Sequence, residues 1–232
     1  MRTLIITGAS KGIGFETAKL FADDGYRVIN ISRTVAADSR IENHSIDLSG
    51  PDAETITRTL LDDILEDGVL SLVHNAARLI NDSAADSITA DFRSMLDINV
   101  VAPHILNQIL IPKMQPGSSI TYIGSTLSEK AVANSYSYVV SKHAVVGMMR
   151  STCQDLQGKQ IHTACVCPGF TDTEMLRTHV GEDQEILDSI ASGSTFGRLV
   201  QPEEVAETIK FAATHPVING TIIHANLGQI EN

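Results

Sequence analysis

A phenol and an ammonium lie one helical turn apart in the segment Tyr138-Val139-Val140-Ser141-Lys142. The i and i+4 spacing puts both side chains on the same face of a helix. A free tyrosine has a pKa of about 10, and a neighbouring ammonium favours the phenolate, so the pair suits proton transfer nearer neutral pH. Because Tyr-x3-Lys is common in helices, its interpretation depends on the residues around it.

Two further polar residues, Ser125 and Asn99, could contribute to the same catalytic site. Ser125 follows a strand-like run, 119–124, and its hydroxyl could hold a substrate carbonyl at the carboxyl edge of a sheet. Asn99 lies in an apolar helical run, 92–110, where its amide either holds an ordered water or bonds the helix itself. The predicted catalytic residues are Asn99, Ser125, Tyr138 and Lys142.

A glycine-rich turn connects the first predicted strand, Thr3–Thr7, to a helical stretch. Its glycines have the spacing Gly-x3-Gly-x-Gly. A strand, a glycine turn and a helix in that order present free backbone N–H groups to a pyrophosphate, so we predict a dinucleotide cradle here. Its binding residues are Gly8, Ser10, Lys11, Gly12, Ile13 and Gly14.

The residues after the second predicted strand, Arg27–Ser32, indicate which dinucleotide binds. An acid at this point suits the ribose 2′-hydroxyl of NAD, whereas an arginine suits the 2′-phosphate of NADP. The strand runs into Ser32-Arg33-Thr34 without an acid, and Lys11 offers a second cation. These residues predict NADP, unless Arg33 is only a solvated surface residue.

Elements that could position these residues alternate along the chain. Short apolar runs alternate with longer segments of helical period, which is typical of a parallel sheet with crossover helices. The expected strands are Thr3–Thr7, Arg27–Ser32, 43–46 (the weakest), Leu70–His74, 119–124, 161–167 and 221–224. We therefore predict one α/β domain over 1–232, a doubly wound (Rossmann) parallel sheet of about seven strands with helices on both faces. The polar segment 171–197 is expected to be a substrate flap, with one or two short helices.

Composition excludes several classes of protein. The net charge of −11 disfavours binding to nucleic acid or anionic membranes. The first residues lack the apolar core of a signal peptide, and no run approaches the roughly 18 apolar residues of a membrane helix, so we expect a cytoplasmic protein. Three cysteines suggest no disulfide framework, and Cys165 and Cys167 should share one buried strand face. Scattered histidines predict no metal site.

These motifs together resemble the short-chain dehydrogenase/reductase family, and most of all its 3-oxoacyl-carrier-protein reductases and related carbonyl reductases. The family's TGxxxGxG motif corresponds to Thr7 through Gly14, and its catalytic tetrad to the four residues above. Its acid after the third strand corresponds to Asp47-Leu48, and its Pro-Gly turn to Pro168-Gly169. The resemblance covers nearly the whole chain.

The resemblance implies a role for each position. Tyr138 would protonate the carbonyl oxygen, Lys142 would also hold the nicotinamide ribose, Ser125 would orient the carbonyl, and Asn99 would support a water-linked relay. The cofactor would also meet Asp47, Leu48, Asn75, Ala76, Pro168, Gly169, Thr171 and Thr173. Two departures stand out: His74-Asn75-Ala76-Ala77 replaces Asn-Asn-Ala-Gly, and 225–228 replaces the usual Asp-Gly-Gly.

The predicted function is NADPH-dependent hydride transfer to a carbonyl of a small molecule. One alternative is an NADP-binding regulatory or structural protein with little turnover. Another is a nucleotide-sugar epimerase or dehydratase, which the chain length and the glycine spacing disfavour. Apolar surfaces on the helical runs 92–110 and 136–156, which pair across a twofold axis in the family, predict a homo-oligomer, a tetramer or a dimer.

Overall fold

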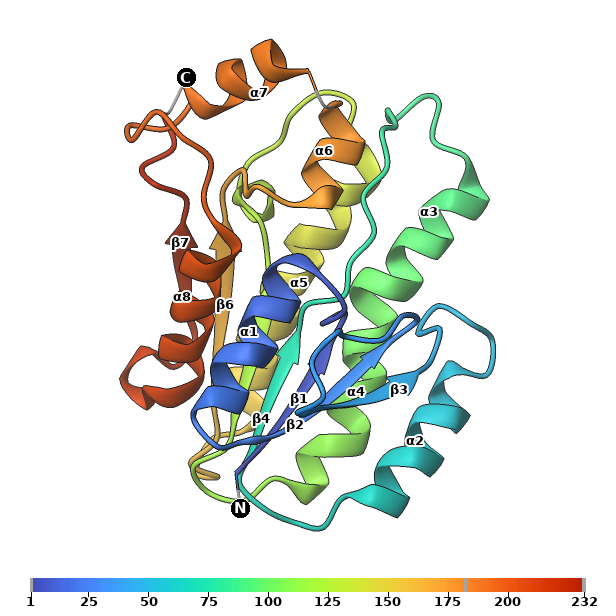
Figure 1. Cartoon of the computed structure of the whole chain (residues 1–232). Coiled ribbons are helices and arrows are strands. Elements are labelled where there is room, and N and C mark those ends of the chain that lie inside the picture. The colour runs from blue at the N-terminus through green and yellow to red at the C-terminus, as the bar shows by residue number, and fades with distance from the viewer. Residues whose placement is uncertain (1, 182, 231–232) are drawn as a thin grey trace.

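A computed structural model describes residues 2–181 and 183–230 of the chain; residues 1, 182, 231 and 232 lie outside the described part. The described residues form one seven-stranded sheet in which every pairing is parallel (Figure 1). The strands are β1 (Thr3–Thr7), β2 (Arg27–Ser32), β3 (Ile41–Ser45), β4 (Leu70–His74), β5 (Ser119–Ile123), β6 (His162–Pro168) and β7 (Thr221–Ala225).

The strand order is β3-β2-β1-β4-β5-β6-β7. The chain winds outward from β1 in one direction as far as β3, and then returns to pair β4 against the other side of β1. Ligands of such sheets bind outside the carboxyl ends of the strands, at this reversal. The doubly wound parallel sheet predicted from the sequence is confirmed.

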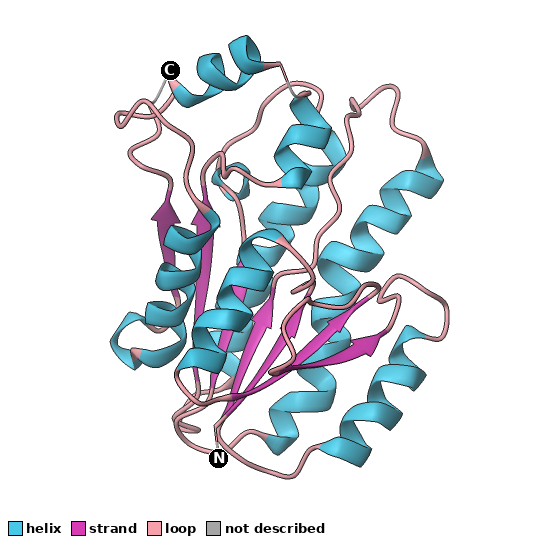
Figure 2. Cartoon of the chain, viewed as in Figure 1, coloured by secondary structure: helices cyan, strands magenta, loops and turns pink. Residues whose placement is uncertain are grey.

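Helices cover both faces of the sheet (Figure 2). Alternate side chains of a strand point to opposite faces. In β1, Leu4 and Ile6 accordingly join the core beneath α1 (Gly12–Asp23) and α8 (Pro202–Thr214). Ile5 joins the other core, against α2 (Ala53–Ile64), α4 (Ala102–Leu110) and α5 (Tyr136–Asp155).

The weakest predicted strand begins earlier than the sequence suggested. Residues 43–46 were expected, but β3 begins at Ile41, which is buried and pairs with Val28. Polar residues follow it on this edge strand, so the apolar pattern that reveals a strand is weak there. The ends of β5, β6 and β7 differ from the predicted ends by one residue.

One helical run is longer and more apolar than the sequence reading allowed. It comprises α3 (Thr89–Leu96), a π-helical turn η1 (Asp97–Val101), α4 and a 3₁₀ turn η2 (Ile111–Lys113). By length and composition alone it could cross a membrane, contrary to the expectation of no such run. Half of its apolar window is buried in the protein, as in a helix that covers a sheet.

Two short helices follow β6 over the carboxyl edge of the sheet (Figure 1). They are α6 (Glu174–Val180) and α7 (Gln184–Ala191). Both fall in the segment 171–197 that is predicted to be a flap, of which residue 182 lies outside the described residues. In β6, Cys165 and Cys167 are free and buried on one face of the strand, with their sulfur atoms 3.8 Å apart.

Candidate active site

The glycine turn after β1 is packed against the end of β4. Gly8 has a φ of +69°, which favours glycine. A Cβ on Gly14 would lie 2.4 Å from both Asn75 Nδ2 and the Gly8 carbonyl oxygen. Asn75 Nδ2 itself donates to the carbonyls of Thr7 and Gly8, at 3.0 and 2.9 Å. The structure therefore brings the predicted cofactor residues Gly8, Gly14 and Asn75 together, and leaves no room for a side chain at Gly14.

The N-terminus of α1 has backbone donors to offer. Lys11 is the N-cap residue, in extended conformation, and its side chain makes no capping hydrogen bond. The first N–H groups of such a helix have no intrahelical partner, and together with the helix dipole they suit an anion. The preceding Ala9 N–H is different, because it donates to Asn30 Oδ1 at 2.9 Å. The sequence reading missed Asn30, although a buried amide in the apolar strand β2 was a signal.

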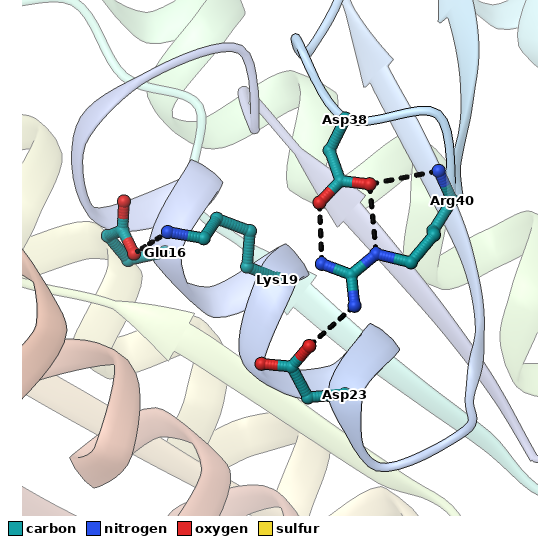
Figure 3. A network of polar contacts seen from close by, with 5 residues as sticks. All are labelled: Glu16, Lys19, Asp23, Asp38 and Arg40. Carbon is teal, nitrogen blue, oxygen red and sulfur yellow. Dashed lines mark hydrogen bonds and ion pairs between the residues drawn. The ribbon is translucent and has the colours of Figure 1, made fainter.

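Most cations along α1 and in the turn between β2 and β3 are already paired. Arg40 bonds Asp38 and also reaches Asp23 of α1, at 2.5 Å (Figure 3). The Arg40 hydrogen bonds lower the pKa of the Asp38 carboxyl to about 2. Lys19 bonds Glu16 in the same view. Arg33 is exposed, and its guanidinium makes no hydrogen bond or ion pair with any residue that the structure describes.

The other residues predicted to contact the adenosine already make different numbers of hydrogen bonds within the protein. The Ser32 hydroxyl is buried and bonds the backbone of Thr34, so it is already used within the turn. Asp47 is exposed, and its Oδ1 accepts from the hydroxyl and N–H of Ser49. These bonds lower the pKa of Asp47, and the charge of Arg33 adds to the effect. Arg33 and Asp47 thus face a common region, with the buried Leu48 beside them.

Ser125 begins a short 3₁₀ turn, η3 (Thr126–Ser128), directly beyond β5. Its Oγ accepts the Leu127 N–H at 3.1 Å, and the Ser128 Oγ accepts the Ser125 N–H at 3.1 Å. A Cβ at the preceding Gly124 would lie 2.6 Å from Cys167 Sγ and 2.8 Å from Ser128 Oγ. This crowding fixes the strand end. Ser128 is a positioning residue that the sequence reading missed.

Tyr138 and Lys142 occupy one face of α5, as their spacing predicted. Lys142 is 3% exposed, and its Nζ donates to the Ile123 carbonyl at 2.7 Å, two residues before Ser125. The same Nζ lies 5.5 Å from the centre of the Tyr138 ring. Tyr138 is partly exposed, and its hydroxyl makes no hydrogen bond within the described part of the chain. Tyr138, Lys142 and the end of β5 therefore lie close together in the structure.

Asn99 lies inside the π-helical turn η1 and is buried. Its Oδ1 accepts the Arg78 N–H at 2.8 Å, and its Nδ2 donates to the Arg78 carbonyl at 3.0 Å and to Ser141 Oγ at 2.9 Å. Ser141 in turn donates to the Tyr138 carbonyl. The amide thus ties the segment after β4 to α5. The water-linked relay expected of Asn99 stays a prediction.

The turn after β6 reaches the glycine loop. A Cβ on Gly169 would lie 2.9 Å from Asn226 Cα, which explains a glycine after Pro168. The buried Thr171 bonds the Gly169 carbonyl, and Thr173 caps α6. A Cβ on Gly12 would lie 3.4 Å from Thr173 Cγ2. The predicted cofactor residues after β6 and the predicted phosphate cradle are therefore adjacent.

A buried polar chain runs behind the site, and the sequence reading did not find it. His74 Nε2 bonds Asn107 Oδ1 at 2.9 Å, Asn107 Nδ2 donates to the Tyr122 hydroxyl at 2.7 Å, and that hydroxyl contacts Thr152. Because the Asn107 oxygen can only accept, the ring hydrogen of His74 lies on Nε2. Burial lowers the pKa of His74 to about 4, so the ring is neutral at physiological pH.

No group of three or more His, Cys, Asp or Glu side chains in the described ranges is arranged to hold a metal ion. The arrangement offers a dinucleotide cradle, a hydroxyl at the end of β5 and a phenol beside a buried ammonium, all at one edge of the sheet. Such a set can bind a nucleotide and move a proton at a carbonyl oxygen.

Comparisons with known proteins agree with this arrangement. A family model described as enoyl-(acyl carrier protein) reductase matches residues 8–229. Carbonyl reductase family member 4 from Xenopus laevis is 30% identical, over 94% of this chain and 93% of the relative.

Two solved structures are similar over nearly their whole length. A short-chain dehydrogenase family protein from Francisella tularensis is 27% identical, with a TM-score of 0.90 and 98% of each chain covered. A protein from Beutenbergia cavernae described as a putative NAD(P)-dependent gluconate 5-dehydrogenase, with bound NADP at low occupancy, is 25% identical. Its TM-score is 0.86, with 97% of this chain and 95% of that chain covered. The chain therefore belongs to the short-chain dehydrogenase/reductase family of oxidoreductases.

Proposed function

We propose that this protein is an NADPH-dependent reductase of small-molecule carbonyl compounds in which Tyr138 is the general acid. One observation carries the proposal. The Lys142 ammonium is 3% exposed and has no carboxylate partner among the described residues, yet it lies beside the Tyr138 ring. A buried, unpaired charge is costly, so its retention calls for a function.

The cofactor would lie across the carboxyl edge of the sheet. Its pyrophosphate fits the free N–H groups at the start of α1, which the packing of Gly8 and Gly14 against the end of β4 holds in place. Its adenosine would lie near Arg33 and Asp47. When bound, a reduced nicotinamide supplies the hydride. Lys142 uses one of its three donors on Ile123, and the others are suited to ribose hydroxyls.

The hydroxyl of Ser125 would orient the substrate. Its oxygen already accepts the Leu127 N–H, so its own hydrogen is left to donate to a carbonyl oxygen. The partly exposed Tyr138 phenol, which has no partner among the described residues, would donate the proton to the same oxygen. The positive charge of Lys142 stabilises the phenolate that remains.

The proposed preference for NADPH is electrostatic. A 2′-phosphate brings nearly two negative charges to a chain of net charge −11, so binding it requires local cations. Of the two cations predicted to meet the phosphate, Arg33 forms no ion pair within the described structure, whereas Lys11 is paired with Glu174. The NADP described with the Beutenbergia cavernae protein supports the proposal.

The test combines binding and turnover. We expect NADPH to bind the wild-type protein at least about tenfold more tightly than NADH. Arg33→Ala should weaken NADPH binding by about ten- to a hundredfold, because a charge-assisted contact contributes roughly 1.5–3 kcal/mol. It should leave NADH binding nearly unchanged. Equal binding of both cofactors by the wild type, or equal weakening of both by the substitution, would contradict the cofactor assignment.

The reaction itself is tested with a panel of ketones, aldehydes, quinones and oxoacyl thioesters. We expect at least one to consume NADPH, followed by the loss of absorbance. An NADP-binding regulatory protein, the alternative function, would bind NADPH and reduce no member of the panel. The presence of both Tyr138 and Lys142 argues against that alternative.

A further inference from the structure

An ion pair joins the glycine loop to the flap that follows β6. Lys11 Nζ lies 2.5 Å from Glu174 Oε1, although the two residues are 163 positions apart. Their side chains are 63% and 67% exposed, so solvent and solutes reach both. The adjacent backbones are also close, since Thr173 lies against Gly12. The pair therefore lies at the mouth of the proposed cofactor site.

The two cations assigned to the 2′-phosphate are not equally available. The Arg33 guanidinium makes no hydrogen bond or ion pair with the described residues, whereas Lys11 is already paired with Glu174. One ammonium cannot fully compensate both a carboxylate and a phosphate dianion. If Lys11 turns to the phosphate, Glu174 is left unpaired close to that phosphate, and two like charges repel.

We propose that Glu174 sets the cofactor preference of the enzyme by competing with the adenosine 2′-phosphate for Lys11. The inference rests on the proposed function, because it takes NADPH as the cofactor. NADPH has to displace the carboxylate, whereas NADH, which lacks the 2′-phosphate, leaves the pair intact. Glu174 is thus a specificity-determining residue that holds the NADPH preference below the level that Arg33 and Lys11 alone would give.

The experiment measures the dissociation constants of NADPH and NADH for four proteins, at moderate salt: wild type, Glu174→Gln, Lys11→Met and the double variant. We expect Glu174→Gln to raise the NADPH-over-NADH preference by about two- to fivefold, the range expected for an exposed ion pair. In the Lys11→Met background, the same substitution should change that preference by much less, because there is no cation to release.

Glu185→Gln is the matched control, since Glu185 is an exposed acid in the first turn of α7 and makes no contact with Lys11. It should leave the preference unchanged. An unchanged or lower preference in Glu174→Gln would overturn the inference, and so would an equal rise with Glu185→Gln or in the Lys11→Met background. These results would leave the proposed function standing. A wild-type protein that binds neither cofactor would instead overturn the proposed function, and the inference with it.

Discussion

Lys142 combines two properties that seldom occur together, deep burial and the lack of a carboxylate partner within the described part of the chain. Its Nζ donates to the Ile123 carbonyl and lies over the ring of Tyr138. The network from Asn99 through Ser141 to the Tyr138 backbone holds the same turn of α5 in place. These hydrogen bonds thus hold the Tyr138 phenol and the Lys142 ammonium in fixed positions.

Replacing Tyr138 by phenylalanine tests the role of the phenol. Tyr138→Phe removes the proposed proton donor and little volume, so NADPH binding should stay within about twofold while kcat falls at least about a thousandfold. Lys142→Ala should differ, because it should weaken NADPH binding as well. Stopped-flow turnover and a binding titration measure both. Activity of Tyr138→Phe within about tenfold of wild type would contradict the assignment.

His74 should make the stability of the protein sensitive to acid. Its pKa is about 4 in the folded protein because burial disfavours the charged ring, whereas an unfolded histidine titrates near 6.5. The unfolded chain therefore takes up a proton below about pH 6.5, and the folded protein does so only near pH 4. Stability is lost as the pH falls through this window.

A glutamine at position 74 removes that titration and can still donate to Asn107. Between pH 7 and pH 5, the free energy of unfolding of the wild type should fall by about 2 kcal/mol more than that of His74→Gln. Urea unfolding at both pH values measures the difference. Parallel losses in the two proteins would show that His74 does not carry the acid sensitivity.

The glycine loop and the end of β4 act as one element, because the Asn75 amide occupies the space beside Gly14. In Gly14→Ala, the new methyl group would lie 2.4 Å from that amide and from the Gly8 carbonyl. We expect a destabilisation of about 1–3 kcal/mol and a clear loss of cofactor affinity. Thermal unfolding and titration measure the two effects.

Gly147 provides the control for this prediction. It lies in α5 and is exposed, and a Cβ at this position would meet no atom within 4 Å. Gly147→Ala should therefore raise stability by up to about 1 kcal/mol, because alanine favours the helix. If both substitutions had the same effect, crowding at Gly14 would not be the cause.

Most of the helices, strands and loops could be predicted from local sequence patterns. Alternating apolar runs specify the strands, and the Thr7–Gly14 motif specifies the loop between β1 and α1. The doubly wound parallel sheet, confirmed in the structure, was predictable because right-handed crossovers leave few alternatives. The π-helical turn at Asn99 was not predictable, since no local propensity distinguishes it from the α-helix on either side.

Long-range polar contacts were also beyond the sequence. Asn107 looks unremarkable in its own segment, and both Asn30 and Asn107 gain their roles from partners on other elements. The Lys11–Glu174 pair is the clearest case, because the flap position follows from tertiary packing and not from periodicity. Arg33, by contrast, could be proposed as a phosphate contact from its sequence position alone, directly after the second strand.

The whole molecule presents an apolar surface on α5 and on the run that includes η1. Val101, Tyr136 and Val140 are 42%, 42% and 36% exposed, and Tyr136 stacks on Phe92 with ring centres 6.0 Å apart. Contiguous apolar patches of this kind mark contact surfaces. We predict that these helices pair between subunits of a homo-oligomer, most simply a tetramer.

Sedimentation of the wild type at micromolar concentration should therefore show a species larger than the 25.0 kDa monomer. Val140→Asp should shift it toward smaller species. Ile56→Asp, at an equally outward position on α2 that is 51% exposed, should not. A wild type that sediments only as a monomer would contradict this prediction.

The order of the strands has a consequence for how such an enzyme can diversify. Every residue proposed to meet the adenosine and the pyrophosphate lies between Gly8 and Ala76, at the ends of β1 to β4, in the turns that follow them or at the start of α1. The predicted catalytic residues lie between Asn99 and Lys142, further along the chain. Two separate stretches of the gene therefore encode the residues proposed to bind the adenosine and pyrophosphate and the predicted catalytic residues. Exchanging the first stretch between relatives should therefore transfer most of the cofactor preference without the catalytic residues, and Glu174 is the proposed determinant of that preference that stays behind.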